Sequence, residues 1–227
     1  MIETIDICKT FRTGSVETIA LNNVSLKVDR GDFIAIMGPS GCGKTTLLNI
    51  IGTIDEPTSG SYKFFDQDIL RLSEKQKTDI RKRNIGFVFQ NFNLIDELSV
   101  YENIELPLVY LGWKKRDRNK RVNEVIDQLN ITHRKDLFPV QLSGGQQQRV
   151  AVARAVVAKP HLLLADEPTG NLDSMHGEEV MTLLNDLNKA GTTIIMVTHS
   201  QRDASYSRRI VHLFDGQIIN ENINSMS

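Results

Sequence analysis

The chain contains the run Phe33-Ile34-Ala35-Ile36-Met37-Gly38-Pro39-Ser40-Gly41-Cys42-Gly43-Lys44-Thr45. Its first five residues are apolar and predict a short buried strand. The residues from Lys44 to Gly52 predict a helix with Leu47, Leu48 and Ile51 on its inner face. The segment between strand and helix has the pattern Gly-x-x-x-x-Gly-Lys-Thr, and this order of elements is typical of a loop that binds phosphate groups.

Such a loop has two features that favour phosphate. Glycines let the backbone curl so that several N–H groups point inward, and the following helix adds the positive end of its dipole. Lys44 is expected to reach the β- and γ-phosphates of ATP, and the Thr45 hydroxyl is expected to ligate Mg²⁺. The predicted ATP-binding residues of the loop are Gly38, Pro39, Ser40, Gly41, Cys42, Gly43, Lys44, Thr45 and Thr46.

Two acids, Asp166 and Glu167, follow the apolar run from His161 to Ala165, which predicts another buried strand. In an open α/β sheet, ligands gather at the carboxyl ends of the strands. Asp166 is therefore expected to bind Mg²⁺, and Glu167 is expected to polarise a water molecule for attack on the γ-phosphate.

Gln90 and His199 end two further predicted strands, over 85–89 and 194–198. A glutamine there can coordinate Mg²⁺ or water, and an imidazole can hydrogen-bond the γ-phosphate and orient the attacking water. The predicted catalytic residues are Glu167, His199 and Gln90, and the predicted metal ligands are Thr45, Gln90 and Asp166.

A second glycine-rich turn, Leu142-Ser143-Gly144-Gly145-Gln146, opens a predicted helix. Ser143 is a suitable N-cap, and capping alone could explain the string. Two consecutive glycines also leave bare N–H groups at a helix N-terminus, which is an anion site. The phosphate loop covers one face of the nucleotide in its own chain. A second phosphate-binding turn is therefore useful if a partner chain supplies it to the other face. We predict a two-fold dimer that sandwiches two ATP molecules. The residues expected to contact ATP from the opposite subunit are Ser143, Gly144, Gly145 and Gln146.

Strand and helix patterns alternate along the rest of the chain, which predicts an α/β fold with a mostly parallel sheet covered on both faces. Helical periodicity dominates from about Asn91 to Ala158, as if a helical block were inserted between two halves of the core. We predict one domain over 1–227, with the nucleotide-binding core in 1–90 and 159–220, a helical subdomain in 91–158 and a polar tail in 221–227.

Composition narrows the possible functions. The 227 residues are 40% hydrophobic and 24% charged with a net charge of −1, which gives no electrostatic case for nucleic acid. The two cysteines, Cys8 and Cys42, provide no disulfide framework and favour a reduced, cytoplasmic setting. No apolar run approaches the roughly 20 residues that cross a bilayer. The basic runs 81–83 and 114–121 are interpreted as solvated helix faces, with contact to anionic lipid headgroups as the alternative.

The motifs resemble, in their family order, those of the nucleotide-binding domain of ABC transporters, over 2–220. The resemblance implies a P-loop NTPase core with an antiparallel β subdomain and an inserted α-helical subdomain. It also implies that Phe11 stacks on adenine and that Gln90 senses the transmembrane partner. Glu167 matches the catalytic base, and His199 matches the switch histidine.

Three segments, 83–94, 102–108 and 165–173, look like the macrolide-exporter and lipoprotein-releasing branch of that family. This likeness implies an ATPase with ATP and Mg²⁺ as cofactors, which forms a homodimer on ATP binding. It also implies an integral-membrane permease as partner, a place on the cytoplasmic face of the membrane, and no nucleic acid.

Two alternative functions fit the sequence less well. A soluble ABC ATPase of DNA repair would need long coiled coils between the two glycine motifs, and one of translation usually carries two nucleotide domains. A subunit that binds ATP without hydrolysing it is disfavoured because Lys44, Asp166, Glu167 and His199 are all present. The transported substrate cannot be read from this sequence, because selectivity resides in the permease.

Overall fold

The computed structural model describes residues 1–14 and 16–223, and the strands in these ranges form two sheets. The first sheet is antiparallel, with the order β2-β1-β4-β5. Its strands are β1 (Ile2–Thr13), β2 (Val16–Val28), β4 (Ser59–Phe64) and β5 (Gln67–Asp68). The second sheet has the order β10-β9-β3-β8-β7-β6 and is parallel except for the edge pair β9–β10. Its strands are β3 (Phe33–Met37), β6 (Ile85–Phe89), β7 (Leu162–Asp166), β8 (Thr193–Thr198), β9 (Arg209–Phe214) and β10 (Gln217–Ile223).

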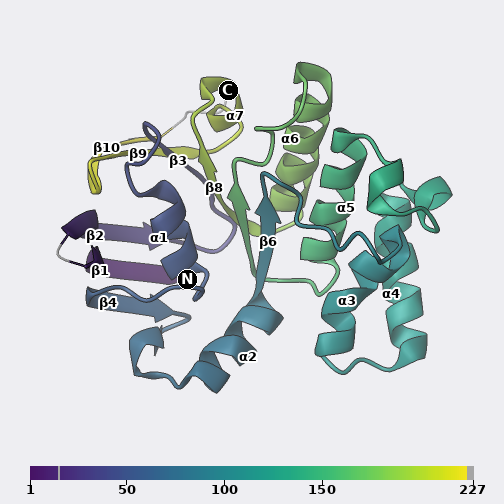
Figure 1. Cartoon of the computed structure of the whole chain (residues 1–227), viewed down its shortest axis with the longest axis horizontal. Helices are drawn as coiled ribbons and strands as arrows, with labels where there is room; N and C mark the ends of the chain where they lie inside the picture. Colours follow the sequence, from purple (N-terminus) through teal and green to yellow (C-terminus); the bar gives the residue numbers. More distant parts are fainter. Residues whose placement is uncertain (15, 224–227) are drawn as a thin grey trace.

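Helices cover the parallel sheet. The α-helices are α1 (Lys44–Ile51), α2 (Glu74–Asn84), α3 (Val100–Tyr110), α4 (Lys115–Gln128), α5 (Gly144–Val156), α6 (Ser174–Lys189) and α7 (Gln201–Ala204). Short 3₁₀ turns occur at η1 (Ile69–Arg71), η2 (Thr132–Arg134) and η3 (Pro139–Gln141). In Figure 1, α1 and the antiparallel sheet lie on one side, and α3, α4 and α5 form a block on the other. Within the described ranges, no helix combines the length and the apolar character that a membrane span requires.

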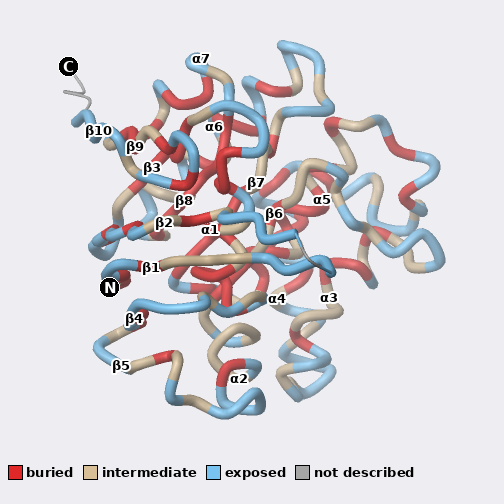
Figure 2. The backbone as a smooth tube through the Cα atoms, turned by 60° about the vertical axis from the view of Figure 1, so that its left-hand side comes forward, coloured by how far each residue is buried: buried red, intermediate tan, exposed pale blue. Residues whose placement is uncertain are grey.

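The core has two halves, one on each face of the parallel sheet. The buried residues gather in the interior of the molecule, and the exposed ones lie mainly at its periphery (Figure 2). In β3, Ile34 and Ile36 pack with α1 and the antiparallel sheet, whereas Phe33 and Ala35 pack with the helices of the other face. Because both faces of β3 are buried, its sequence is a continuous apolar run rather than an alternation. The predicted fold class is confirmed.

Two details differ from the sequence prediction. The strand β10 runs on to Ile223, so the polar tail expected from residue 221 begins inside a paired strand, and 224–227 lie outside the described residues. The side chains of Glu221 and Asn222 are exposed, and their pairing with β9 rests on backbone hydrogen bonds and on an ion pair between Glu221 and Arg209, neither of which hydropathy reveals. The bounds of helix α2 were not predicted, although the basic run 81–83 within it was interpreted as a helix face. Its one buried side chain is Lys77, so no apolar stripe marks a helical period.

Candidate active site

The phosphate loop lies between β3 and α1. Lys44 is 6% exposed, and its ammonium donates to the carbonyl oxygens of Gly38 at 2.8 Å and Pro39 at 2.7 Å. A cavity of about 180 Å³ adjoins the loop. Its lining residues are Ala20, Ser40, Gly41, Gly43, Lys44, Thr45, Thr46 and Glu167. One cavity is therefore lined by Lys44, by Thr45 and by Glu167, the proposed catalytic base.

Backbone contacts hold this loop in place. A Cβ atom on Gly38 would lie 2.1 Å from the carbonyl oxygen of Leu213, the penultimate residue of β9. Gly43 has a φ of +104°, and a Cβ atom there would lie 2.3 Å from the carbonyl oxygen of Ala20 in β2. Only glycine fits such positions, because a main-chain atom cannot move aside as a flexible side chain can.

Thr45 and Asp166, the two predicted metal ligands from α1 and β7, lie next to each other. The Thr45 hydroxyl donates to Oδ1 of Asp166 at 3.3 Å. Burial raises the pKa of Asp166 above its ordinary value, and although the Thr45 hydrogen bond and the Lys44 charge oppose this, the Glu167 charge adds to it. Hydroxyl and carboxylate oxygens are the donors that Mg²⁺ prefers, and the ion usually takes its other ligands from phosphate and water. The pair therefore fits a magnesium ion, whose charge would favour ionised Asp166.

Glu167 and His199 come together at the carboxyl ends of the neighbouring strands β7 and β8. Nδ1 of His199 lies 3.2 Å from Oε2 of Glu167. Glu167 has a φ of +45°, which is uncommon for a residue other than glycine, and its N–H donates to the carbonyl oxygen of Val197 at 2.9 Å. Glu167 lines the phosphate-loop cavity and also a cavity of about 320 Å³ that His199 lines. The carboxylate is thus placed between the phosphate loop and the histidine.

Gln90 follows β6 and is engaged with a different partner. Its Nε2 donates to Oδ1 of Asn171 at 3.2 Å, and Nδ2 of Asn171 donates to the Gln90 carbonyl oxygen at 3.0 Å. Gly170 leaves the room for this contact, since a Cβ atom there would lie 2.7 Å from Gln90 Nε2. The structure therefore joins Gln90 to the turn after the acid pair, and its role as a metal ligand stays a prediction.

The second glycine turn begins α5 with a capping box. The Ser143 hydroxyl accepts from the N–H of Gln146 at 3.4 Å, and Gln146 Oε1 accepts from the N–H of Ser143 at 3.1 Å. The capping interpretation is thus borne out, and it is compatible with anion binding because a helix start leaves further N–H groups unbonded within the helix. Residues 142–146, all of them described, line neither of the two cavities that Glu167 lines.

Phe11 lies on β1, opposite Thr18 of β2, and is 43% exposed. The ammonium of Lys9 lies 4.9 Å from its ring centroid and also donates to Asp55 at 2.6 Å. Ala20, farther along β2, lines the phosphate-loop cavity. A partly exposed aromatic ring thus stands on the same hairpin as Ala20, and its stacking on adenine stays a prediction.

Sequence reasoning missed two polar residues of α5. Gln148 is fully buried, and its Nε2 donates to the carbonyl oxygens of Pro168 at 2.5 Å and Phe89 at 3.4 Å. Arg154 donates to the carbonyl oxygen of Phe92 at 2.9 Å. These bonds tie α5 to the ends of β6 and β7 and to the segment after Gln90. A signal for Gln148 was available: it stands on the buried stripe of the helix, three residues after Gly145 and four before Val152.

Comparisons with known proteins agree with this geometry. The family described as "ABC transporter" matches residues 21–170. The macrolide export ATP-binding/permease protein MacB of Syntrophobacter fumaroxidans is 50% identical over 221 residues, which cover 96% of this chain and 31% of that protein. An uncharacterized ABC transporter ATP-binding protein of Methanocaldococcus jannaschii is 46% identical over 96% of this chain and 98% of its own length. The chain thus spans about a third of the macrolide export relatives and nearly all of the archaeal one.

A solved structure is similar over nearly the whole chain. The dimeric ATP-binding cassette MJ0796, in a post-hydrolysis state bound to ADP and Pi, has a TM-score of 0.91 and 42% identity, and the match covers 98% of both chains. A second dimeric structure of MJ0796, described as a bacterial ABC transporter cassette, is 43% identical with the same TM-score of 0.91.

Proposed function

This chain belongs to the ABC transporter family and is an ABC ATPase, and we propose that it hydrolyses ATP to drive an integral-membrane permease from the cytoplasmic face. The observation that carries the proposal is the convergence of Lys44, Thr45 and Glu167 on one cavity, with His199 at 3.2 Å from the glutamate. The macrolide-exporter branch is proposed because relatives of that name are 42–50% identical. We assign no transported substrate, because the permease determines substrate selectivity.

The proposed chemistry divides between two groups of residues. Lys44 and the loop N–H groups bind the β- and γ-phosphates, while Thr45 and Asp166 hold Mg²⁺. A bound Mg²⁺ neutralises charge that develops on the phosphoryl oxygens. Glu167 accepts a proton from the attacking water, and His199 keeps that carboxylate and the water in position.

A second copy of the chain is proposed to complete each site. The N-terminus of α5 carries Gly144 and Gly145 and lines neither catalytic cavity of its own described chain. Its N–H groups and dipole suit the γ-phosphate held by a partner, and the same arrangement repeated by two-fold symmetry makes two equivalent sites. The similar cassette MJ0796, whose structures are described as dimeric, supports this proposal.

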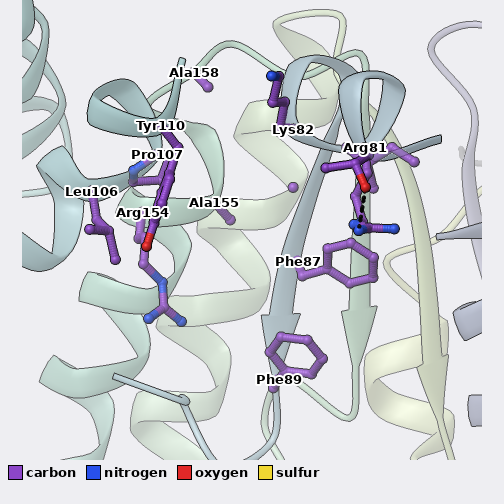
Figure 3. Close-up of a pocket in the computed structure, with 13 residues that line it drawn as sticks. Arg81, Lys82, Phe87, Phe89, Leu106, Pro107, Tyr110, Arg154, Ala155 and Ala158 are labelled. Carbon is purple, nitrogen blue, oxygen red and sulfur yellow. Dashed lines mark hydrogen bonds between the residues drawn. The ribbon is translucent and has the colours of Figure 1, made fainter. Parts of the chain in front are cut away.

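The permease is proposed to dock in an apolar groove between α2, β6, α3 and α5 (Figure 3). The groove has a volume of about 500 Å³. On one wall the rings of Phe87 and Phe89 stack with centroids 5.6 Å apart, and on another stand Pro107 and the 73% exposed Tyr110. Arg154 lines the groove and also binds the backbone after Gln90. A short apolar segment of the permease would fit here, and movement of the Gln90 segment would reach it.

The test uses Glu167→Gln protein in size-exclusion chromatography with saturating ATP and Mg²⁺. We expect this variant to elute as a dimer and to hydrolyse ATP about 10²–10⁴-fold more slowly, because the base is lost while nucleotide binding is kept. The exposed Glu97→Gln is the matched control and should hydrolyse at the parent rate. A Glu167→Gln variant that stays monomeric and retains full turnover would overturn the proposal.

A second measurement separates the permease-driving role from that of a soluble ABC ATPase. We expect the chain, isolated from its own cells, to co-purify with an integral membrane protein. Co-purification with ribosomes or DNA instead would favour the other class.

A further inference from the structure

The two glycines of the second turn have different neighbours within their own chain. A Cβ atom on Gly145 would lie 2.6 Å from Cδ2 of His176, and 2.8 Å from both Cβ and Cγ of that residue. A Cβ atom on Gly144 would find its nearest neighbour, Leu172 Cδ2, at 3.5 Å, which is ordinary van der Waals contact. An alanine therefore fits at Gly144 but overlaps another residue at Gly145.

His176 is held so that it cannot yield easily. Its Nδ1 lies 2.7 Å from Oδ2 of Asp173, and its backbone N–H donates to Oδ1 of the same carboxylate at 3.0 Å. An ionised carboxylate only accepts hydrogen bonds, so Nδ1 carries the proton and the ring orientation is fixed. Two of the overlapping atoms, Cβ and Cγ, lie next to the backbone, and Cβ keeps its place in every rotamer.

We propose that His176 is the positioning residue of the second glycine turn. Clamped by Asp173, it packs against Gly145 and sets where the first N–H groups of α5 stand. Position 145 is thus glycine because of this side chain of the same chain. Gly144 has room within its chain, so its requirement arises from what approaches the turn from outside.

The consequence for catalysis rests on the proposed function. If the start of α5 contacts the γ-phosphate of a partner, His176 aims that contact without touching the nucleotide. Loss of the side chain should then weaken ATP-driven dimerisation. Binding of ATP to a single chain should be unaffected, because residues 143–146 and 176 are not among those that line the phosphate-loop cavity.

The packing is tested first, on nucleotide-free protein, by melting temperature in a double-mutant cycle. The set is parent, Gly145→Ala, His176→Gly and the double variant, with Gly144→Ala as the matched control. We expect G145A to melt roughly 3–10 °C below the parent, because overpacking strains a well-packed site. In the H176G background, Gly145→Ala should lower the melting temperature by at most about 1 °C, since glycine at position 176 removes every overlapping side-chain atom. G144A should melt within about 1 °C of the parent.

The positioning role is tested in the Glu167→Gln background by ATP-dependent dimerisation. We expect H176G to weaken the dimer by at least about tenfold, while the affinity of the monomer for a fluorescent ATP analogue stays unchanged. His176→Asn keeps a donor toward Asp173 and should restore the dimer. G144A should lose the dimer although it melts like the parent, and G145A should lose both dimer and stability.

The outcomes are distinguishable. If G145A melts like G144A, or loses the same stability with and without the His176 side chain, the role given to His176 is wrong. If H176G lowers monomer ATP affinity as much as it weakens the dimer, the positioning role is wrong. If the Glu167→Gln parent itself does not dimerise with ATP, the proposed function fails, and the melting cycle still decides whether His176 fixes Gly145.

Discussion

The two glycine-rich turns of this chain are held by different kinds of contact. The phosphate loop is pressed against main chain, with Gly38 facing the Leu213 carbonyl and Gly43 facing the Ala20 carbonyl. The second turn is capped by its own Ser143 and Gln146 and, as proposed above, positioned by the side chain of His176. A loop fixed by the backbone of sheet strands cannot be displaced without moving the sheets. A turn fixed by a side chain can be moved by one substitution in a neighbouring helix.

This difference matches the parts that the two turns are proposed to play. The phosphate loop shares a cavity with Glu167 and is proposed to bind the nucleotide with residues of its own chain. The second turn belongs to the helical block and is proposed to act only on the partner's nucleotide. A rigid half-site and a movable half-site are what a dimer that closes and reopens requires.

The largest expected effect separates binding from closure. Lys44→Ala should reduce the ATP affinity of the single chain by about 10²-fold or more, because charge-assisted bonds to phosphate contribute about 1.5–3 kcal/mol each. Titration of a fluorescent ATP analogue measures this, with the exposed Lys189→Ala as control. Ser143→Ala should bind the analogue as tightly as the parent. Equal losses in the Lys44 and Ser143 variants would mean that both turns serve one nucleotide in one chain.

The next effect concerns the backbone contacts of the phosphate loop. Gly38→Ala should lower the free energy of unfolding by about 1–3 kcal/mol or more, because the new methyl group meets a carbonyl oxygen. Gly41→Ala, at a φ of +79° with nothing within 4 Å, should cost only about 1–2 kcal/mol of backbone strain. Urea denaturation of the nucleotide-free proteins measures both.

A suppressor experiment sharpens the contrast between the turns. Since Gly38 faces a main-chain atom, neither Leu213→Ala nor Cys42→Ala should rescue Gly38→Ala, although the Cys42 Sγ atom is also close to it. Rescue by either of them would show that the phosphate loop, like the second turn, is held by a side chain.

How far the sequence predicts the structure depends on how local each signal is. Helix α6 runs from Ser174 to Lys189, and the sequence marks it locally by the Asp173 cap and by its apolar period. The strands β3, β6 and β8 could be predicted because each is an apolar run. The bounds of helix α2 could not, although the sequence contains its Ser73–Gln76 capping box, because its residues are mostly charged or polar and show no helical period of apolar residues.

The same distinction applies to the site. Lys44 and Thr45 belong to one contiguous motif, and the meeting of Glu167 with His199 follows from parallel strands ending at one edge of the sheet. The contacts of Gln90 with Asn171, and of Gly145 with His176, depend on how one loop or helix packs on another. No spacing rule encodes such packing, so these contacts could not be predicted.

The capping box of the second turn gives a smaller effect. Ser143→Ala should cost about 1 kcal/mol, or roughly 2–4 °C in melting temperature, because the N-cap acceptor is lost. Ser143→Asp keeps an acceptor and should melt close to the parent. Its negative charge would face the partner's γ-phosphate, so in the Glu167→Gln background it should abolish the ATP-dependent dimer. A Ser143→Asp protein that still dimerises would leave Ser143 with capping as its only function.

The smallest expected effect concerns Asp173, whose carboxylate holds His176 against the second turn. Hydrogen bonds from the backbone N–H and the side chain of His176 lower the pKa of Asp173 below its ordinary value of 3.8. A carboxyl whose pKa is lowered in the folded state contributes stability above its unfolded pKa and loses it as the pH falls through the folded one. Asp173→Asn keeps a good N-cap but removes the charge.

Near pH 6 the parent should therefore melt about 1–3 °C higher than Asp173→Asn, and this difference in melting temperature should disappear as the pH is lowered past the ordinary carboxyl range. A gap that stays constant down to about pH 3 would show that the carboxylate charge adds nothing to the clamp on His176, and that neutral hydrogen bonding alone holds the second turn.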